Sequence, residues 1–316
     1  METRSIGSLD VSLVGLGCNN FGMRIDEAGT KAVVDACLDE GINFFDTADV
    51  YGGRGKSEEF LGKALGSRRD EVLIATKFGS PMSDDGQSQG GSRRWITQAV
   101  EGSLRRLGTD RIDLYQLHAP DADTPQEETL AALDELVKAG KVREIGCSNF
   151  GSTLMDEAES ISKDKGLARY VSVQNNYSLL ERGVEKKVLP ACEKYGIGFL
   201  PYFPLASGLL TGKYHTKDDR PEGTRITLMA QAMPERAEQT LTDENFAIIG
   251  KLRAYAEEHG HTLLELAMSW LASQPVISSV IAGATKPEQV KANAASVNWK
   301  MTDEEMAQIG ELAKRG

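Results

Sequence analysis

The chain has 316 residues, of which 40% are hydrophobic and 26% charged, and its formal net charge is −11 at pH 7. This composition is typical of a soluble globular protein, and the length fits either one large α/β barrel or two ordinary domains. The acidic balance argues against nonspecific binding to nucleic acid or to an anionic membrane, and no apolar run is long enough for a transmembrane helix.

The N-terminal segment and the cysteines bear on where the protein works. The first residues lack the charged-then-apolar pattern of a signal peptide. Four cysteines, Cys18, Cys37, Cys147 and Cys192, lie far apart and form no Cys-x-x-Cys pair. This spacing predicts neither a metal site nor a disulfide framework. We therefore expect reduced cysteines in a cytoplasmic protein.

The first predicted element is a small β-hairpin. Ser5–Ile6 and Leu9–Val11 flank the turn pair Gly7-Ser8. We expect this hairpin to plug the bottom of the barrel that the next elements predict.

Eight short strand-like runs follow in chain order, and a helical stretch comes after each of them. The runs are Leu13–Gly17, Asn43–Thr47, Val72–Lys77, Ile112–His118, Val142–Ser148, Tyr170–Asn175, Ile197–Phe203 and Ile277–Ala282. Strand–helix repeats predict a parallel sheet, and eight is the number that closes a (β/α)8 barrel, the TIM barrel.

Several of the helices carry start and stop signals. Thr124-Pro-Gln-Glu127 has the form of a capping box with proline at the first helical position, and Gly140 ends that helix. Thr262-Leu-Leu-Glu265 and Thr302-Asp-Glu-Glu305 repeat the capping pattern.

The chain shows no linker of the kind that separates domains, so we expect one domain over residues 1–316. The stretch from Leu205 to about Asp243 is the one long irregular segment, and it belongs on the top face because it follows the seventh strand. Met306, Ile309 and Leu312 mark an extra C-terminal helix.

Polar residues gather at the predicted C-terminal ends of the strands, where barrels of this type build their active sites. They are Asp46, with Tyr51 in the loop beyond it, Lys77, His118, Ser148, Asn149 and Gln174. Each alone has an ordinary structural explanation, such as a capped turn, a solvated rim residue or a hydrogen-bonded histidine. Those explanations weaken when all of these groups converge on one face of one barrel.

The combination of residue types suggests proton transfer to a substrate oxygen. A free phenol has a pKa of about 10, and a cation held against it lowers that pKa. Lys77 can be the cation for Tyr51, and Asp46 would keep the lysine charged and aimed. His118 would offer a second hydrogen-bond donor to a carbonyl. Such a site suits reduction by hydride, which requires a cofactor.

These residues lie in motifs that resemble the aldo-keto reductase superfamily along essentially the whole chain, including its bacterial and potassium-channel β-subunit-like members. The motifs are GLGCNNFG (15–22), FFDTADVYG (44–52), TKFG (76–79), IDLYQLH (112–118), GKVREIGCSNF (140–150), VQNNYS (173–178), PYFPLASGLLTGKY (201–214) and IAGATKPEQVKAN (281–293). The resemblance implies a TIM barrel with a catalytic tetrad, and the matching positions are Asp46, Tyr51, Lys77 and His118.

The resemblance also implies how a nicotinamide cofactor binds. Ser148, Asn149 and Gln174 match the residues that bind the carboxamide, and Tyr202 matches the aromatic residue that stacks on the nicotinamide ring. Further contacts at the first two strand ends are assigned to Gly17, Cys18, Asn19 and Asp46.

The remaining cofactor assignments concern the phosphates. The loop that wraps the pyrophosphate matches Leu205, Ser207, Gly208, Leu210 and Lys213. Phe203 and Pro204 are assigned to cofactor binding as well, and Arg225 matches a cofactor-contacting arginine. Where relatives often have serine, Phe203 puts an apolar ring close to the cofactor.

A clamp for the adenosine 2′-phosphate matches Gly283, Thr285, Lys286, Gln289 and Asn293. Lys286 would place positive charge at a helix N-terminus, which favours NADPH (NADP+ in its oxidised form). Many family members have arginine in place of Gln289 and glutamate in place of Ala292, so NADH is possible as well.

Four further side chains are expected to form the substrate wall, and metal ligands are not expected. The wall residues are Phe21, Met23, Phe78 and Trp95.

A Rossmann fingerprint is a competing interpretation of Gly15-x-Gly17. It requires a third glycine three residues after the second, but position 20 is Asn20 and the next glycine is Gly22. The spacing and the eight repeats both oppose this interpretation.

The sequence therefore predicts an NADPH-dependent oxidoreductase that reduces the carbonyl of a small aldehyde or ketone, with Tyr51 as general acid. Alternatives are an NAD(P)-dependent sugar or polyol dehydrogenase and a cofactor-binding regulatory subunit. A metal-dependent hydrolase is disfavoured because the four histidines do not converge on strand ends. Nothing in the sequence distinguishes a monomer from a homo-oligomer.

Overall fold

The computed structural model describes residues 1–84, 86–219 and 222–315. Within these ranges the chain forms two compact units, and each is described by itself. The first unit is Met1–Asn175, Val184–Tyr202 and Val276–Ala294, and the second is Asn176–Gly183, Phe203–Pro275 and Ala295–Gly316. The single domain over residues 1–316 stays a prediction.

The first unit contains the predicted parallel sheet. Its eight strands are β3 (Val14–Gly17), β4 (Phe44–Asp46), β5 (Leu73–Phe78), β6 (Ile112–Leu117), β7 (Val142–Ser148), β8 (Tyr170–Asn176), β9 (Gly198–Tyr202) and β10 (Val280–Gly283). Their order is β10-β3-β4-β5-β6-β7-β8-β9. The two end strands approach each other, because the Phe199 N–H donates to Val276 O at 2.9 Å and the Ser278 N–H donates to Phe199 O at 3.0 Å. The predicted TIM barrel is thus confirmed.

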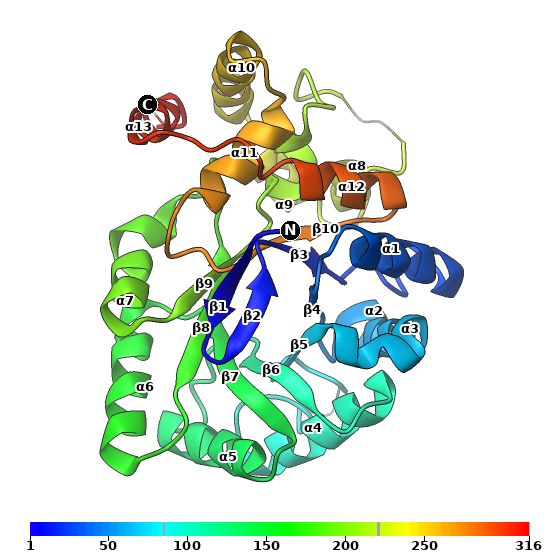
Figure 1. Cartoon of the computed structure of the whole chain (residues 1–316), viewed down its shortest axis with the longest axis vertical. Coiled ribbons are helices and arrows are strands. Elements are labelled where there is room, and N and C mark those ends of the chain that lie inside the picture. The colour runs from blue at the N-terminus through cyan, green and yellow to red at the C-terminus, as the bar shows by residue number, and fades with distance from the viewer. Residues whose placement is uncertain (85, 220–221, 316) are drawn as a thin grey trace. The chain divides into compact units, whose positions relative to one another are not determined.

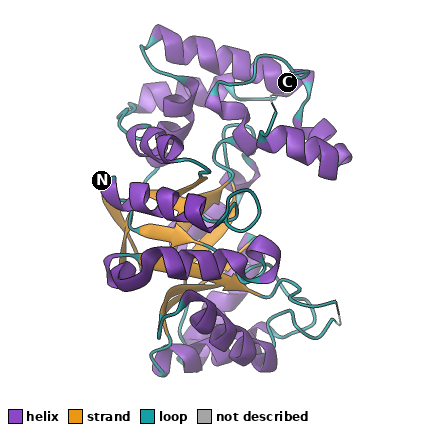
Figure 2. Cartoon of the chain, turned by 90° about the vertical axis from the view of Figure 1, so that its right-hand side faces the viewer, coloured by secondary structure: helices purple, strands orange, loops and turns teal. Residues whose placement is uncertain are grey.

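Helices surround the strands of this unit, as Figure 1 shows. They are α1 (Glu27–Asp39), α2 (Tyr51–Arg54), α3 (Lys56–Leu65), α4 (Arg93–Leu107), α5 (Gln126–Lys138), α6 (Ser152–Lys165), α7 (Val188–Tyr195) and α12 (Pro287–Ala295), with short 3-10 turns η1 (Gly66–Glu71) and η2 (Gly183–Lys186). In α4, Ile96, Val100 and Leu107 recur at helical spacing and are buried. The side view shows strands running between helices (Figure 2).

The predicted capping box at the start of α5 is wrong. The N-cap of α5 is Pro125, and no side chain caps the helix. Thr124 instead bonds the carboxylate of Asp121, which also accepts from the Gly91 N–H at 2.7 Å. Because that carboxylate offers the Thr124 hydroxyl a stronger, charged acceptor, the threonine serves the preceding turn. Gly140 does end the helix, with φ 74 just beyond the C-cap Ala139.

The N-terminal hairpin fills the barrel from one end. Its strands β1 (Thr3–Ile6) and β2 (Leu9–Ser12) pair antiparallel, with Ile6 opposite Leu9. Three hairpin side chains share one buried cluster with residues from six barrel strands: Ile6, Leu9, Val11, Phe44, Ala75, Leu114, Val171, Leu200 and Ile281. Each such burial contributes about 1.5–3 kcal/mol, so the hairpin acts as the predicted plug.

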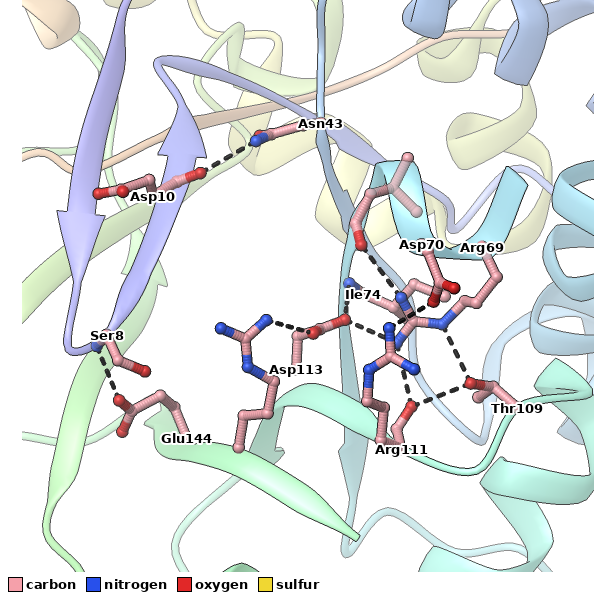
Figure 3. Close-up of polar contacts among 12 residues, drawn as sticks. Ser8, Asp10, Asn43, Arg69, Asp70, Ile74, Thr109, Arg111, Asp113 and Glu144 are labelled. Carbon is pink, nitrogen blue, oxygen red and sulfur yellow. Dashed lines mark hydrogen bonds and ion pairs between the residues drawn. The ribbon is translucent and has the colours of Figure 1, made fainter. Parts of the chain in front are cut away.

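A polar network lies at the N-terminal ends of β5, β6 and β7 (Figure 3). Asp113 is 1% exposed and accepts from Arg69 at 2.7 Å, from Arg143 at 3.0 Å and from the Ile74 N–H at 2.9 Å. The hairpin turn joins the same end of the sheet, because the Ser8 N–H donates to Glu144 Oε1 at 2.7 Å. These bonds stabilise the end of the barrel opposite the strand ends that carry the predicted site.

The second unit is helical. It contains the 3-10 segment η3 (Ala206–Thr211) and the helices α8 (Arg225–Ala232), α9 (Pro234–Thr240), α10 (Asp243–Glu258), α11 (Leu263–Ala272) and α13 (Asp303–Leu312). The prediction that Leu205 to about Asp243 is irregular is therefore wrong. The helices there have only seven or eight residues, too few for a clear periodic pattern.

The helix starts predicted for this unit are confirmed. Both capping boxes, Thr262 with Glu265 and Thr302 with Glu305, are present, and α13 is the predicted C-terminal helix. Trp299 donates to the capping Glu305 at 3.3 Å and stacks on the ring of His261, with centroids 4.1 Å apart. The stack links the starts of α11 and α13.

Candidate active site

The centre of the predicted site is an ion pair between two neighbouring strands. Asp46 ends β4, and Lys77 lies one residue before the end of β5. Lys77 Nζ lies 2.7 Å from Asp46 Oδ2 and 2.9 Å from Thr47 O, and the lysine side chain is fully buried. Burial lowers the pKa of Lys77, but the charge of Asp46 and the phenol of Tyr51 outweigh it, so the pKa lies above its usual value. The lysine is therefore a cation at neutral pH.

The second carboxylate oxygen of Asp46 is occupied by two amides. Gln174 Nε2 donates to Asp46 Oδ1 at 2.9 Å and Gln116 Nε2 donates at 3.3 Å. Both carboxylate oxygens of Asp46 are thus hydrogen-bonded by side chains from neighbouring strands. Sequence analysis did not identify Gln116. The alternation of side chains along the strand could have identified it, because Gln116 pairs with Lys77 across β5 and β6.

Tyr51 stands over this pair because of an unusual turn. It begins α2, in which Gly52 has φ 70 and Gly53 has φ 77. A Cβ on Gly52 would lie 2.7 Å from the Phe21 carbonyl oxygen, so the position requires glycine. Lys77 Nζ lies 5.2 Å from the centroid of the Tyr51 ring. The two left-handed glycines thus shape the turn that carries Tyr51.

His118 completes the cluster from the end of β6. Its ring meets the Tyr51 ring edge to face, with centroids 5.6 Å apart. Burial, and next the charge of Lys77, lower the pKa of His118 to about 3. The imidazole is therefore neutral at pH 7 and carries one N–H. Its Nδ1 lies 3.1 Å from Ser80 Oγ, a contact that sequence analysis did not anticipate.

The predicted carboxamide-binding residues form one hydrogen-bonded group beside His118. Asn149 has φ 63, donates to the His118 carbonyl at 2.9 Å and accepts from the Tyr202 hydroxyl at 2.8 Å. Ser148 Oγ donates to Gln174 O at 2.8 Å and accepts from Asn149 Nδ2 at 3.2 Å. Amide and hydroxyl groups held this closely match the donors and acceptors of a carboxamide, so the residues present fit a nicotinamide.

The strand ends of β3 and β10 bring the next cofactor assignments together. Gly17 pairs with Gly283 in the sheet, and a Cβ on Gly283 would lie 3.6 Å from Asn19 Oδ1. Cys18 is buried, and its N–H donates to Asp46 O at 2.8 Å. Burial, and next the charge of Asp46, raise the pKa of the Cys18 thiol well above its usual value, which disfavours the thiolate.

The predicted phosphate clamp lies at the start of α12. Lys286 is exposed just before the helix begins at Pro287. Gln289 Oε1 accepts from the Thr285 N–H at 2.7 Å and from its hydroxyl at 3.2 Å. Asn293 is buried on the same helix. Gln289 therefore orders the loop itself, whereas Lys286 is left to face solvent.

The residues predicted to bind the pyrophosphate, together with Phe203, Pro204 and Arg225, belong to the second unit. Phe203, Ser207 and Gly208 have φ 53, 59 and 99, so the segment around η3 is tightly turned. The Arg225 guanidinium carbon lies 4.5 Å from the centroid of Phe203. The other assigned residues of this segment differ in exposure. Pro204 and Leu210 are buried, and Leu205 is half-buried. Lys213 is exposed, with its Nζ 5.1 Å from the Tyr214 ring centroid. Their role in cofactor binding stays a prediction.

The four predicted wall residues differ in exposure. Phe21 and Phe78 are fully buried, and Phe78 stacks on Tyr115 with centroids 4.6 Å apart. Trp95 is buried in α4, and Met23 is 72% exposed. Met23 thus differs from the other three in presenting a large apolar surface to solvent. The wall itself stays a prediction.

Among residues 1–84, 86–219 and 222–315, no set of three or more His, Cys, Asp and Glu side chains is arranged to hold a metal ion. No helix in those ranges combines the length and apolar character needed to span a bilayer.

Comparison with known proteins agrees with this geometry. The model of the Aldo/keto reductase family matches residues 13–314. A probable voltage-gated potassium channel subunit beta from Oryza sativa subsp. japonica is 37% identical over 307 residues, which cover 94% of this chain and 92% of the relative. Aldo-keto reductase YhdN from Bacillus subtilis (strain 168) is 34% identical, covering 99% and 93%. L-glyceraldehyde 3-phosphate reductase from Escherichia coli O157:H7 is 31% identical, covering 98% and 91%. The chain therefore belongs to the aldo/keto reductase family and is an oxidoreductase that uses a nicotinamide cofactor.

Proposed function

We propose that this protein reduces aldehyde or ketone carbonyls to alcohols with NADPH. The observation that carries the proposal is the buried pair of Lys77 and Asp46 beneath Tyr51, with neutral His118 at its edge. A buried cation beside a phenol has its clearest use in proton transfer to an oxygen that gains negative charge.

Each side chain has a distinct role in this reaction. Tyr51 gives its phenolic proton to the carbonyl oxygen, and Lys77 stabilises the phenolate that remains. Asp46 holds Lys77 charged and fixed by their 2.7 Å contact. His118, being neutral, donates its single ring N–H to the same carbonyl oxygen and orients it. NADPH, when bound, supplies the hydride.

The nicotinamide assignment rests on Ser148, Asn149, Gln174 and Tyr202. These groups are already hydrogen-bonded to one another, so they need little reordering to bind a carboxamide. The preference for NADPH rests on Lys286, whose exposed ammonium at the start of α12 suits a phosphate. Gln289, which bonds Thr285, offers no positive charge, so NADH remains the competing cofactor in the test below.

The relatives guide the choice of substrates and of a second candidate function. One relative is named for reduction of L-glyceraldehyde 3-phosphate, which favours small aldehydes in the first screen. Another is named as a probable potassium channel subunit beta, which favours a regulatory role as the second candidate. Four free, buried cysteines agree with a cytoplasmic location.

The decisive experiment is the Tyr51→Phe variant. We expect carbonyl reduction, followed as NADPH oxidation, to fall by at least about a hundredfold, because a positioned general acid contributes at least that much. NADPH binding, followed by quenching of tryptophan fluorescence, should be largely kept. The matched control is Tyr255→Phe, which removes a hydroxyl that bonds Gln308 in the second unit. A near-normal rate for Tyr51→Phe would overturn the assignment.

Cofactor preference is tested by the same fluorescence titration with NADPH and NADH. Much tighter NADPH binding that weakens in Lys286→Ala would support the clamp. Equal or tighter NADH binding would overturn the NADPH proposal and direct the screen to oxidation of sugars and polyols. Tight cofactor binding without turnover of any carbonyl or alcohol would favour the regulatory role.

A further inference from the structure

Ser80 makes a contact with His118 that the proposed mechanism does not yet use. Ser80 lies two residues beyond the end of β5, and its Oγ is 3.1 Å from His118 Nδ1. The backbone of His118 is fixed separately, because its N–H donates to Phe78 O at 2.9 Å and its carbonyl accepts from Asn149. Among the contacts described for the His118 ring, the serine bond is the one that engages a ring nitrogen.

A bond to one ring nitrogen decides where the other nitrogen's proton lies. Neutral imidazole carries one proton, on either Nδ1 or Nε2. If the serine hydroxyl donates to Nδ1, that nitrogen is an acceptor and the proton must be on Nε2. If Nδ1 instead donates to the hydroxyl, Nε2 is left without a proton and has nothing to offer a carbonyl oxygen.

We propose that Ser80 is a positioning residue whose hydroxyl donates to His118 Nδ1 and so holds the ring proton on Nε2, ready for the substrate oxygen. The effect of Ser80 on the His118 tautomer stands by itself, whereas the use of the Nε2 proton for a substrate oxygen rests on the function proposed above. Ser80 touches neither substrate nor cofactor in this role, since it acts through His118.

The loop that carries Ser80 is built to hold it in place. Gly79 has φ 101, and a Cβ there would lie 2.9 Å from Leu117, so glycine is required beside the serine. The Gly90 N–H donates to Gly79 O at 2.9 Å and closes the loop at its base. These contacts fix Ser80 before any substrate binds, as a positioning group requires.

The same loop also reaches the turn of Tyr51. Asp84, farther along the loop, forms an ion pair with Arg54, the last residue of α2. Arg54 has φ 70, a left-handed conformation that is uncommon for arginine. One loop therefore contacts both His118, through Ser80, and the turn that carries the predicted acid, through Asp84.

The tautomer is tested directly by NMR of the full chain with 15N-labelled histidine. The two ring nitrogens have well-separated shifts in each tautomer, and His118→Gln assigns the signals. We expect a bare Nδ1 and a protonated Nε2 in the wild type at pH 7, and a mixture of tautomers in Ser80→Ala. The control is Ser88→Ala in the same loop, where the bond described is made by the backbone carbonyl to Met82 N–H.

Activity supplies a second readout. Loss of one net hydrogen bond of about 0.5–1.5 kcal/mol predicts that Ser80→Ala lowers kcat roughly two- to thirteenfold. Ser80→Thr should restore most of it, because threonine keeps the hydroxyl. Ser88→Ala should leave kcat and the tautomer unchanged, and the melting temperatures of all variants should agree closely.

The outcomes separate the two proposals. A proton on Nδ1 in the wild type, or no change of tautomer in Ser80→Ala, would overturn the role of Ser80 whatever the activity. Absence of carbonyl reduction in the wild type, with the Nε2 tautomer present and lost in Ser80→Ala, would overturn the proposed function and support Ser80 as the residue that sets the tautomer.

Discussion

Lys77 Nζ and Asp46 Oδ2 lie 2.7 Å apart at the ends of neighbouring strands, and water reaches almost none of either side chain. Such a pair stabilises the fold only while both charges are present. Removing one partner leaves a buried, uncompensated charge and costs about 3–5 kcal/mol. Stability and the proposed catalysis therefore depend on the same two residues. Single and double variants can distinguish the effect on stability from the effect on catalysis.

We predict that Asp46→Asn lowers the free energy of unfolding by about 3–5 kcal/mol and abolishes carbonyl reduction, because Lys77 stays buried without its carboxylate. Asp46→Asn combined with Lys77→Met should regain most of the stability and none of the activity. Urea unfolding and NADPH oxidation measure the two effects. If the double variant were no more stable than Asp46→Asn, a buried lysine charge would not be the cause.

The neutral state of His118 predicts an unusual pH dependence. Because its folded pKa is about 3, the rate should show no inflection near pH 6.5 from this group. Below about pH 6.5, His118 binds a proton in the unfolded chain but stays neutral in the folded protein. Its contribution to stability is thus fully present above that pH and falls by about 1.4 kcal/mol per pH unit as the pH drops toward 3.

His118→Gln should remove this part of the slope of unfolding free energy against pH. His259→Gln is the control, because His259 is exposed in the second unit. A wild-type slope that is unchanged in His118→Gln would mean that His118 is protonated in the folded protein.

Asp49 lies between Asp46 and Tyr51 in the chain and is fully buried. Neither carboxylate oxygen has a hydrogen-bond partner of good geometry among the described residues. Burial, and next the charge of Glu58, raise the pKa of Asp49 well above its usual value. The folded state therefore disfavours the ionised group, and stability falls as the pH rises from about 3.9, the unfolded pKa, toward the folded one.

Asp49→Asn should accordingly raise the free energy of unfolding at pH 7 by about 1–3 kcal/mol and have little effect at pH 4. The measurement is urea unfolding at both pH values, with exposed Asp123→Asn as the control. A loss of stability at pH 7 would show that the Asp49 carboxylate has a stabilising partner.

Gly52 and Gly53 offer a matched test of the turn under Tyr51. Both have positive φ, but a Cβ on Gly52 would lie 2.7 Å from two backbone atoms, whereas a Cβ on Gly53 meets nothing within 4 Å. Gly53→Ala should cost about 1–2 kcal/mol of conformational strain and keep most of the activity. Gly52→Ala should displace Tyr51 and lower kcat at least tenfold. Equal rates for the two variants would contradict the steric explanation.

The barrel was predictable because its signals are local and repeated. Each strand is a short apolar run, and the polar residues at the ends of Phe44–Asp46 and Leu73–Phe78 must converge once parallel strands close. The hairpin was likewise predictable from the turn pair Gly7-Ser8 between two apolar runs. The order of these elements therefore determined where Asp46, Lys77 and His118 meet.

Other features were not predictable because they depend on partners far along the chain. Nothing near Ser80 indicates that its hydroxyl meets a ring 38 residues later. Asp49 resembles any loop carboxylate until the fold buries it. Thr124 fits a capping box as written, but Asp121 three residues earlier competes for its hydroxyl. Local patterns cannot rank such competing partners.

The pairing of β3 with β10 sets a condition on how the protein is made. The Val280 N–H donates to Leu13 O at 2.8 Å, so the barrel closes between residues from opposite ends of the chain. At about 5–20 residues per second, a ribosome needs on the order of tens of seconds to reach β10 after it has made β3. During that time β3 has an unpaired edge on the nascent chain. Chaperone binding to ribosome-bound fragments that end before residue 276 should therefore exceed binding to the released protein.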